Sequence, residues 1–477
     1  MLLGIDLGTS SVKAAVMDED GTVKQVASAA YPVESAVPGW AETDPDAWWL
    51  ATRKAVSSLD RMHRRRIAAI GLAGQMHGLV LAREEGHAVR PAILWADSRS
   101  GRELDRYRRL SPHLRRVLAN PPVTGMAGPT LLWIKRHESS RYKDARWGLQ
   151  PKDWLRLTLT SEVYSEPTDA SATLLYDFVQ DAWSLDVLKE LDIRPSLLPE
   201  IVPSHQMAGR LRDGAAQELG LDDGLPVAAG AADTAASLVG HGLFKPGKVL
   251  LTIGTGAQLT SVRTEFRPDP TMRTDLYRTV EKGKWYSMAA ILNAGLALDW
   301  VRRLFHLDWD ALYRSAFQAP PGAGGVAFLP LVVGERTPRS DSKAKACWSG
   351  IGLHHGREHL FRAALEGVAF ALRGAMERLE AVGISASELH LAGGGTVDQP
   401  WRQLLADVLG KRLMAVIGPG GAARGAALLA GLSAGLYESP DDTAALGLRY
   451  EQVAEPGPAA DEYSSLYRRH KSAQWPR

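Results

Sequence analysis

The chain has 477 residues, of which 45% are apolar and 23% are charged. Such a composition is typical of a globular protein with two or three large-cored domains. The net charge is only +2, so the sequence predicts neither nucleic acid nor an acidic membrane surface as a partner.

Predicted strands and helices alternate through the first half of the chain. Apolar runs that end in turn residues predict strands at 2–5, 12–17, 22–31, 67–72, 79–82 and 225–230. Helical spacing of apolar residues predicts helices at 45–59, 103–118, 128–137 and 234–241. The strands at 12–17 and 22–31 are separated by an acidic turn and are expected to form an antiparallel hairpin.

The strand pattern restarts after about residue 244. Further strands are predicted at 249–253, 284–288, 389–392 and 412–417, and helices at 296–305, 356–382, 401–409 and 420–437. The residues after Glu438 are rich in Gly, Pro and acidic side chains and are expected to pack loosely. The whole pattern predicts mixed α/β domains, with one domain at 1–244 and a second at 245–477.

The first strand ends in a polar turn. Asp6 is followed by Gly8, Thr9 and Ser10, and Lys13 comes shortly afterwards. Gly8 lets the backbone approach a ligand closely, the two hydroxyls are donors and Lys13 adds positive charge, so the turn is suited to phosphate. Asp6 can hold Mg²⁺, directly or through water. A polar hairpin turn without a ligand is the alternative.

A second turn of this kind follows the strand at 249–253. It contains Gly254 and Thr255, and three glycines, Gly393 to Gly395, follow the strand at 389–392. Two Gly-Thr turns in two halves of the chain indicate two similar domains that bind the phosphates of a nucleotide. The glycine run strengthens that interpretation because it lets a ligand approach the backbone.

Asp233 follows an apolar strand and has small neighbours on both sides. A carboxylate in such a place can accept the proton of an attacking hydroxyl group. Aspartate at the start of a helix is also a common N-cap. Both roles stay open, and one residue can serve both.

A short peptide, Gly74 to Gly78, lies between two predicted strands and contains Met76 and His77. Methionine offers a soft apolar wall, and histidine can form a hydrogen bond with a sugar hydroxyl. The segment Trp95 to Arg99 also follows a strand and is expected to border the same pocket. Either Met76 or His77 alone would more often be a core or surface residue.

Three other patterns match known sites only in part. The segment 242–249 is close to a P-loop but has Val249 at the last position and precedes a strand. The segment 418–423 matches a dinucleotide fingerprint, but too little chain follows it to build the half-domain. His355 and His359 have a zinc-hydrolase spacing that includes Gly356, a poor residue for a helix interior. None of the three is expected to be a functional site.

Two features of the sequence bear on cellular location. The single cysteine, Cys347, cannot form an internal disulfide, so a reducing, cytoplasmic environment is expected. No basic leader precedes the first strand, and no signal peptide is predicted. The segment 420–437 contains Arg424 and is expected to be a packed helix rather than a membrane span. Oligomeric state stays open, with a homodimer among the alternatives.

These patterns together resemble the FGGY carbohydrate kinases of the actin, hexokinase and heat-shock-ATPase superfamily, over nearly the full chain. The resemblance rests on 5–10, on 39–45 with Thr43 where glutamine is usual, on Trp95-x-Asp97-x-Arg99, and on a long pattern from Ala346 to Glu366. It implies two ribonuclease-H-like domains of the actin/hexokinase type with a catalytic cleft between them. ATP and Mg²⁺ are the implied cofactors.

Within that family, the Gly-Gln-Met-His-Gly peptide resembles the sugar pocket of the xylulokinase branch, as do 151–155 and 334–338. This implies an enzyme that uses ATP to phosphorylate D-xylulose to D-xylulose 5-phosphate. By resemblance, Met76 and His77 contact the sugar and Asp233 is both the catalytic base and a substrate contact. Asp6 is implied to be catalytic, and both Asp6 and Asp233 are implied to lie at the metal.

The implied nucleotide contacts are Gly8, Thr9, Ser10, Lys13, Gly254 and Thr255 at the phosphates, Gly394 and Gly395 near the adenosine, and Asp398, where many members of the family have asparagine. A kinase for another ketopentose or a polyol, such as D-ribulose, L-ribulose or a tetritol, is the closest alternative. A non-catalytic sugar or ATP sensor of the same fold is a second alternative.

Overall fold

The computed structural model describes residues 1–334, 345–418 and 420–473. The chain forms two compact units. The first unit contains 1–244, 277–285 and 418–448, and the second contains 245–276, 286–417 and 449–477. Among the described residues, no helix combines the length and apolar character that a membrane crossing requires.

The first unit is built on a mixed sheet in the order β11-β12-β5-β1-β2-β3, with β13 also paired to β5. The strand β2 is antiparallel to both β1 and β3, whereas β5 is parallel to β1 and β12 is parallel to β5. Their bounds are Leu2–Leu7 (β1), Ser11–Met17 (β2), Val23–Ala30 (β3), Ala69–Gly74 (β5), Met207–Arg210 (β11), Pro226–Ala228 (β12) and Ala231–Ala232 (β13).

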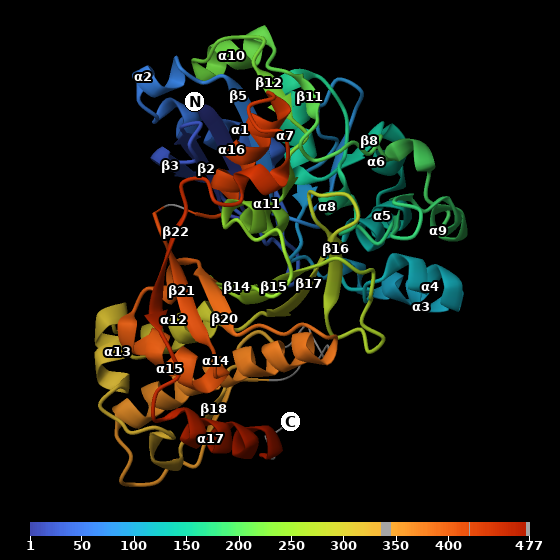
Figure 1. The fold of residues 1–477 in the computed structure, drawn as a ribbon. Coiled ribbons are helices and arrows are strands. Elements are labelled where there is room, and N and C mark those ends of the chain that lie inside the picture. Colours follow the sequence, from blue (N-terminus) through green and yellow to red (C-terminus); the bar gives the residue numbers. More distant parts are fainter. Residues whose placement is uncertain (335–344, 419, 474–477) are drawn as a thin grey trace. The chain divides into compact units, whose positions relative to one another are not determined.

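Helices cover both faces of this sheet. Alternate residues of β1 point to opposite faces. Leu3, Ile5 and Leu7 share a core with Trp48 of α1 (Pro45–Ser57) and Leu155 of α7 (Pro151–Thr160). The opposite face of β1 and β5 contacts α16 (Ala422–Ser433), which also packs against α11 (Asp233–Gly240). In Figure 1 the orange-red α16 lies among the blue strands of the N-terminal segment.

Glycines let α16 approach the strands β1 and β5 and the helix α11 very closely. A β-carbon on Gly4 or Gly71 would lie 1.8 Å from a carbonyl oxygen of α16, and one on Gly425 would lie 1.8 Å from the Ala236 carbonyl oxygen of α11. Buried Arg424 then donates hydrogen bonds to the carbonyl oxygens of Gly240 and Gly21. The compact units thus differ from a simple division near residue 244, because 418–448 packs with the first unit, as does 277–285.

The second unit repeats the sheet plan. Its strands follow the order β17-β15-β14-β20-β21-β22, with β14 antiparallel to β15 and parallel to β20. One of the points at which the chain passes between the units falls within β16 (Asp275–Arg278). The bounds are Val249–Ile253 (β14), Ala257–Arg263 (β15), Trp285–Ile291 (β17), Glu388–Ala392 (β20), Arg412–Ile417 (β21) and Arg449–Ala454 (β22). Its helices are α12 (Gly295–Leu304), α13 (Trp309–Ala316), α14 (Arg357–Ala381), α15 (Gln399–Leu409) and α17 (Ala460–Ser472).

The remaining elements are short helices and two-stranded pairs outside the two large sheets. In the first unit the helices are α2 (Arg61–Arg64), α3 (Leu104–Arg109), α4 (Pro112–Leu118), α5 (Ala127–His137), α6 (Ser139–Asp144), α8 (Pro167–Ala170), α9 (Leu185–Glu190) and α10 (Asp213–Leu219). Short strands pair as β4 (Glu42–Thr43) with β7 (Ala92–Ile93), β6 (Val80–Ala82) with β8 (Trp147–Leu149), β9 (Tyr176–Asp177) with β10 (Ala182–Trp183), and β18 (Ala327–Leu329) with β19 (Cys347–Ser349).

Two local expectations were wrong. The helix expected over 103–118 is interrupted, because Ser111 caps α4 by accepting a hydrogen bond from the Leu114 N–H, and Pro112 occupies the first turn. The tail after Glu438 is not loose throughout: β22 pairs with β21, and Tyr463 and Tyr467 of α17 are buried in the second core.

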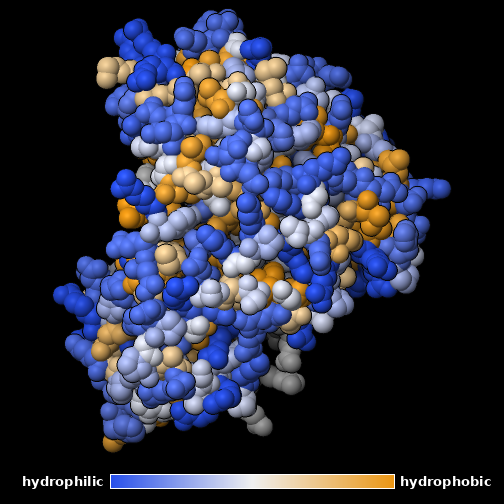
Figure 2. Space-filling model, viewed as in Figure 1, coloured by the Kyte–Doolittle hydropathy of each residue, from blue (hydrophilic) through white to orange (hydrophobic). Residues whose placement is uncertain are grey.

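On the face seen in Figure 2, hydrophilic residues predominate and hydrophobic ones form small scattered groups.

Candidate active site

Three chain segments of the first unit meet at one edge of its sheet. Asp6 of β1 is paired in register with Ala73 of β5, and Ala73 is paired with Ala231 of β13. All three strands are parallel, so their carboxyl ends lie together, as they do at ligand sites of α/β sheets. Asp6 lies near the end of β1, Met76 and His77 follow β5, and Asp233 follows β13. The structure thus brings the predicted sugar, metal and base residues together.

The Asp6 carboxyl group is held away from water. Burial and, to a lesser degree, the charge of Asp233 raise the pKa of Asp6 to about 7, and Lys13 opposes the rise. Its Oδ1 is buried and has no hydrogen-bond partner among the described residues. A buried carboxylate oxygen without a donor is unfavourable alone and is well suited to a cation.

The raised pKa of Asp6 predicts a specific pH dependence of stability. The folded protein binds the Asp6 proton more tightly than the unfolded chain, whose aspartates titrate near pH ~4. Without metal, the contribution of Asp6 to stability is therefore lost as pH rises from about 4 to about 7. Asp6→Asn removes this penalty, so the stability of the variant relative to wild type should increase with pH across that window. Urea denaturation in EDTA measures this, with the exposed Asp222→Asn as control, and a pH-independent difference would contradict it.

Asp233 begins α11 as its first helical residue, and the N-cap position belongs to Ala232. Its Oδ1 accepts hydrogen bonds from the N–H of Thr234 at 2.6 Å and from the Thr234 hydroxyl at 3.2 Å. These contacts orient the carboxyl group and leave Oδ2 as the oxygen that can receive a proton. Burial raises the pKa of Asp233 to about 6, and the hydrogen bonds from Thr234 oppose the rise. A carboxyl group with such a pKa is suited to general base catalysis near neutral pH.

The peptide after β5 is a tight turn. The Gly78 N–H donates to the Met76 carbonyl oxygen at 2.9 Å, and His77 between them has φ of 71°. A non-glycine residue in this left-handed region is strained, and such strain is concentrated at functional sites. The Nδ1–H of His77 donates to the Ala172 carbonyl oxygen at 2.8 Å, so in the neutral ring Nε2 is the acceptor nitrogen. Met76 and His77 are each 6% exposed.

The first Gly-Thr turn is a compact link between β1 and β2. The Gly8 N–H donates to the Ser11 carbonyl oxygen, and the Tyr31 N–H donates to that of Ser10. Thr9 accepts a hydrogen bond at Oγ1 from the indole N–H of Trp95 at 3.0 Å. Lys13 on β2 is exposed and stands opposite Asp6 in the β1–β2 register. Backbone, hydroxyl and ammonium groups are therefore close to the Asp6 carboxyl group.

Sequence reasoning missed two polar residues of this region. Gln75 is buried, its side-chain amide donates to the Gly8 carbonyl oxygen and the Tyr31 hydroxyl at 3.4 Å each, and its Oε1 has no partner within the described part of the chain. The Tyr31 hydroxyl also donates to the Gly8 carbonyl oxygen. Burial raises the pKa of Tyr31, so it stays a neutral donor. The available signal was the polar side chain of Gln75 directly after the apolar strand β5.

The segment from Trp95 to Arg99 serves two purposes. Trp95 reaches the Gly-Thr turn, but Asp97 and Arg99 are buried together, with Arg99 Nη2 2.6 Å from Asp97 Oδ2. Arg99 also stacks 3.6 Å from the ring centroid of Trp40. Asp97 accepts the Ala41 N–H at 2.7 Å. These two charged residues therefore hold the segment 39–42 in place rather than border a pocket.

The second Gly-Thr turn has an equivalent setting in the second unit. Gly254 and Thr255 are exposed at the end of β14, and the Leu296 N–H of α12 donates to the Thr255 carbonyl oxygen at 2.8 Å. A β-carbon on Gly295 would lie 2.2 Å from the Gly254 carbonyl oxygen, so α12 begins directly against the turn. The amino end of a helix favours anions, and α12 is long enough to contribute there.

The glycine run Gly393 to Gly395 lies beside this turn. β-Carbons on Gly393 and Gly395 would lie 2.3 and 2.6 Å from atoms of Ile253, whereas one on Gly394 would meet nothing within 4 Å. Gly394 is therefore the open position of the run. Asp398 is the N-cap of α15 and accepts the Trp401 N–H at 2.9 Å. The structure thus assigns the Asp398 carboxylate a helix-capping contact.

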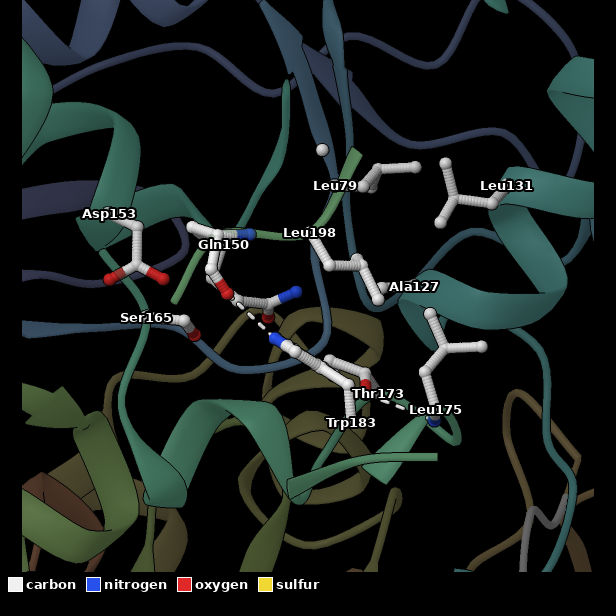
Figure 3. A pocket seen from close by; sticks show the side chains of 12 residues that line it. Leu79, Ala127, Leu131, Gln150, Asp153, Ser165, Thr173, Leu175, Trp183 and Leu198 are labelled. Atoms are coloured by element: carbon white, nitrogen blue, oxygen red, sulfur yellow. Dashed lines mark hydrogen bonds between the residues drawn. The ribbon is translucent and has the colours of Figure 1, made fainter. Parts of the chain in front are cut away.

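A small cavity lies within the first unit. It offers about 10 Å³ to the centre of a water molecule, so a pentulose cannot enter it. Figure 3 shows polar Gln150, Asp153 and Ser165 on one side of it and Leu131 and Leu175 on the other. Met76, His77 and Asp233 are not among its lining residues. The cavity is therefore distinct from the strand-end site.

The patterns set aside in the sequence have structural contacts of their own. His355 Nδ1 accepts the Gly352 N–H, and its Nε2 faces the Gly324 carbonyl oxygen. His359 Nδ1 accepts the Gly356 N–H at the start of α14. The segment 418–423 leads into α16, although Pro419 lies outside the described residues. The pattern at 334–338 lies outside them as well, except for Gly334.

Comparison with known proteins decides the family. The N-terminal domain of the FGGY family of carbohydrate kinases matches residues 1–240, and the C-terminal domain of the same family matches residues 249–434. The chain belongs to the FGGY family of carbohydrate kinases. FGGY kinases transfer phosphate from ATP to a carbohydrate, so the chain is a carbohydrate kinase of the actin-like α/β fold, and its expected fold class is confirmed.

Individual relatives of this FGGY kinase extend over nearly its whole length. It is 32% identical to a xylulose kinase of Bacillus subtilis over 99% of this chain and 96% of the relative. It is 36% identical to a xylulose kinase of Escherichia coli over 91% and 90%. The crystal structure of a xylulose kinase from Rhodospirillum rubrum is 30% identical, with a TM-score of 0.88 over 99% of this chain and 97% of that one. The recognition of the family, and of its xylulose kinases as near relatives, is confirmed.

Proposed function

We propose that this FGGY kinase phosphorylates the C5 hydroxyl group of D-xylulose. The observation that carries the proposal is the meeting of Asp6, Met76-His77 and Asp233 at the ends of three neighbouring strands. The near-full-length similarity to xylulose kinases supports the choice of sugar. A sugar hydroxyl needs a base, a cation near the phosphates and a polar wall, and the residues at this edge of the sheet suit the base, the cation's ligand and the wall.

In the proposed reaction, Asp233 Oδ2 takes the proton of the C5 hydroxyl group. The C5 oxygen forms a bond to the γ-phosphorus of ATP while the bond between that phosphorus and the β,γ-bridging oxygen breaks, which gives xylulose 5-phosphate and ADP. His77 accepts a hydrogen bond from a sugar hydroxyl through Nε2, and Met76 packs against the carbon skeleton of the sugar. Positioning and charge stabilisation supply most of the rate in reactions of this type.

The two Gly-Thr turns are proposed to bind the nucleotide's phosphates. In the first unit, Gly8 lets the backbone approach the phosphates closely, Thr9 and Ser10 offer backbone and hydroxyl donors, and Lys13 offers charge. In the second unit, Gly254 and Thr255 do the same beside the amino end of α12. Gly394 is proposed to lie against the adenosine, because a β-carbon at this position would meet no described protein atom within 4 Å. Because the Asp398 carboxylate already accepts the Trp401 N–H, Asp398 is proposed to act on nucleotide binding indirectly, by capping α15.

The residues at the strand ends fit Mg²⁺. Asp6 has a buried oxygen without a donor, and the nearby charge of Asp233 makes a negative pair that a divalent cation would neutralise. Mg²⁺ in kinases is held by one or two carboxylates together with phosphates and water. Asp6 would hold the ion, directly or through water, and Asp233 would lie near it. When bound, Mg²⁺ would neutralise charge on the transferred phosphoryl group.

A panel of sugars tests the substrate. With D-xylulose, D-ribulose, L-ribulose and erythritol in a coupled assay of ADP release, kcat/KM should be highest for D-xylulose by about tenfold or more. His77→Ala, which leaves Met76 in place, should reduce that preference by removing the polar contact. A tenfold preference for D-ribulose would show a kinase of another ketopentose. Sugar binding without phosphorylated product would show a sensor.

A further inference from the structure

A buried network of charged side chains lies directly beneath the strand-end site. Lys152, Asp153, Glu166 and Asp169 are each 0–1% exposed. Lys152 Nζ lies 2.6 Å from Asp153 Oδ1, 3.2 Å from Glu166 Oε1 and 3.0 Å from Asp169 Oδ2. Burial opposes the charge of Lys152, but the three carboxylates hold its pKa above the usual value. So much buried charge is unfavourable unless it is fully paired, and none of these residues touches the reaction proposed above.

The network converges on Glu166. Its Oε1 accepts from the Thr168 hydroxyl at 2.8 Å and the Asp169 N–H at 2.9 Å, and faces Lys152. Its Oε2 accepts from the Thr168 N–H at 2.8 Å and the Ser204 hydroxyl at 2.7 Å. Five donors thus fix one carboxylate. The short helix α8, which begins one residue later, is held in place by these bonds.

Thr168 connects this hydrogen-bonded network to the segment that contains Asp233. The Ala232 N–H donates to Thr168 Oγ1 at 2.7 Å. Because Oγ1 accepts that bond, its own hydrogen is directed to Glu166, so the hydroxyl group has a fixed orientation. Ala232 is the residue immediately before Asp233, and it pairs with Gly74 of β5. The hydroxyl group of Thr168 is therefore one residue from the proposed base.

The same loop also reaches the sugar-site turn. Ala172, four residues after Thr168, accepts the hydrogen bond from His77 Nδ1. On the other side, a β-carbon on Gly74 would lie 2.7 Å from the Lys152 β-carbon, so the start of α7 supports the peptide that leads to Met76. The network beneath the site thus contacts both the segment with the base and the segment with the sugar ligands.

We propose that Thr168 is a positioning residue for Asp233, and that Glu166 and Lys152 act by holding the Thr168 hydroxyl group in place. This inference rests on the proposed function, because it assumes that Asp233 is the base. Removing the hydroxyl group leaves the Ala232 N–H buried without its acceptor. The start of α11 can then shift, and small displacements of a catalytic group have large effects on rate.

The test compares two substitutions at one position. Thr168→Val has the shape of threonine but no hydroxyl group, whereas Thr168→Ser keeps the hydroxyl. In T168V, kcat with D-xylulose should fall about 10- to 100-fold while the KM for ATP changes by less than about threefold. T168S should retain activity within about threefold of wild type, because its hydroxyl can make both bonds. Equal loss in both variants, or none in T168V, would overturn the inference.

A second background separates a positioning role from a general structural one. In Asp233→Asn, where the base is gone, adding T168V should change the residual rate by less than about twofold. A further loss as large as in wild type would show a merely structural effect and overturn the inference. Normal turnover in T168V beside an inactive Asp233→Asn would overturn the inference alone. Normal turnover in Asp233→Asn would overturn the proposed base and this inference together.

Folding is monitored in the same samples. Circular dichroism and thermal unfolding show whether T168V is native at the assay temperature. If it is not, Thr168→Cys replaces it, since its sulfur accepts a hydrogen bond weakly and the packing is nearly kept. An intermediate kcat in T168C, between those of T168S and Asp233→Asn, supports the inference, and a kcat equal to wild type overturns it.

Discussion

Asp233→Asn should lower kcat by about 10²- to 10⁴-fold, the range typical of losing a general base. Asparagine keeps the shape of the side chain and its Oδ1 can still accept from the Thr234 N–H, so α11 should form as in wild type. An amide cannot take the proton of the attacking hydroxyl group. The rate of D-xylulose phosphorylation, followed by ADP release at saturating substrates, measures the loss.

The controls for this variant are its affinity for ATP and the substitution of an exposed aspartate elsewhere in the first unit. ATP affinity should stay within about threefold of wild type, because the proposed adenosine contacts come from the second unit. The exposed Asp223→Asn should be as active as wild type. Near-normal turnover in Asp233→Asn would remove this residue from the role of base. An equal loss of ATP affinity would show that the carboxyl group serves nucleotide binding instead.

Gly425→Ala should destabilise the protein by about 3 kcal/mol or more, the upper end of overpacking effects. The added methyl group would lie 1.8 Å from the Ala236 carbonyl oxygen and 2.7 Å from its carbon, both backbone atoms that cannot move aside. The helices α11 and α16 would have to separate, and the apolar face of the first sheet would lose its cover. Chemical denaturation followed by circular dichroism measures the change.

Gly374→Ala is the matched control. This residue also lies within a helix, α14, but the nearest atom to an added β-carbon is the Tyr467 hydroxyl oxygen at 3.5 Å, an ordinary contact. Alanine is a better helix former than glycine, so this variant should be as stable as wild type or gain up to about 1 kcal/mol. A Gly425→Ala protein as stable as Gly374→Ala would contradict the close packing of α16.

Much of the fold could be predicted from the sequence because the patterns that indicate its strands and turns are local. Apolar periodicity located most of the strands, and their polar ends placed Asp6, the Met76-His77 peptide and Asp233 at turns. Parallel pairing of β1, β5 and β13 then explains why those turns meet. The interruption near Ser111 was also legible, since serine followed by proline is typical of a helix start.

Other features depend on contacts between distant residues and could not be predicted in this way. The Gly/Ala composition of α16 indicated close packing, but no local pattern shows that its partners are Gly4 and Gly71. Lys152 and Glu166 appear as ordinary polar residues in the sequence, and only the fold reveals that they are fully buried as a pair. The capping role of Asp398 also required the structure, because aspartate suits both a cap and a ligand contact.

The route of the chain has a consequence for biosynthesis. The strands of the first sheet leave the ribosome early, but α16, which covers one of their faces, is translated only after most of the second unit. Until then the nascent polypeptide exposes apolar side chains that the finished molecule hides, and such surfaces invite aggregation. The N-terminal half should therefore be the part that depends most on chaperones, even though it is made first. It should also be the part that misfolds when translation stops early.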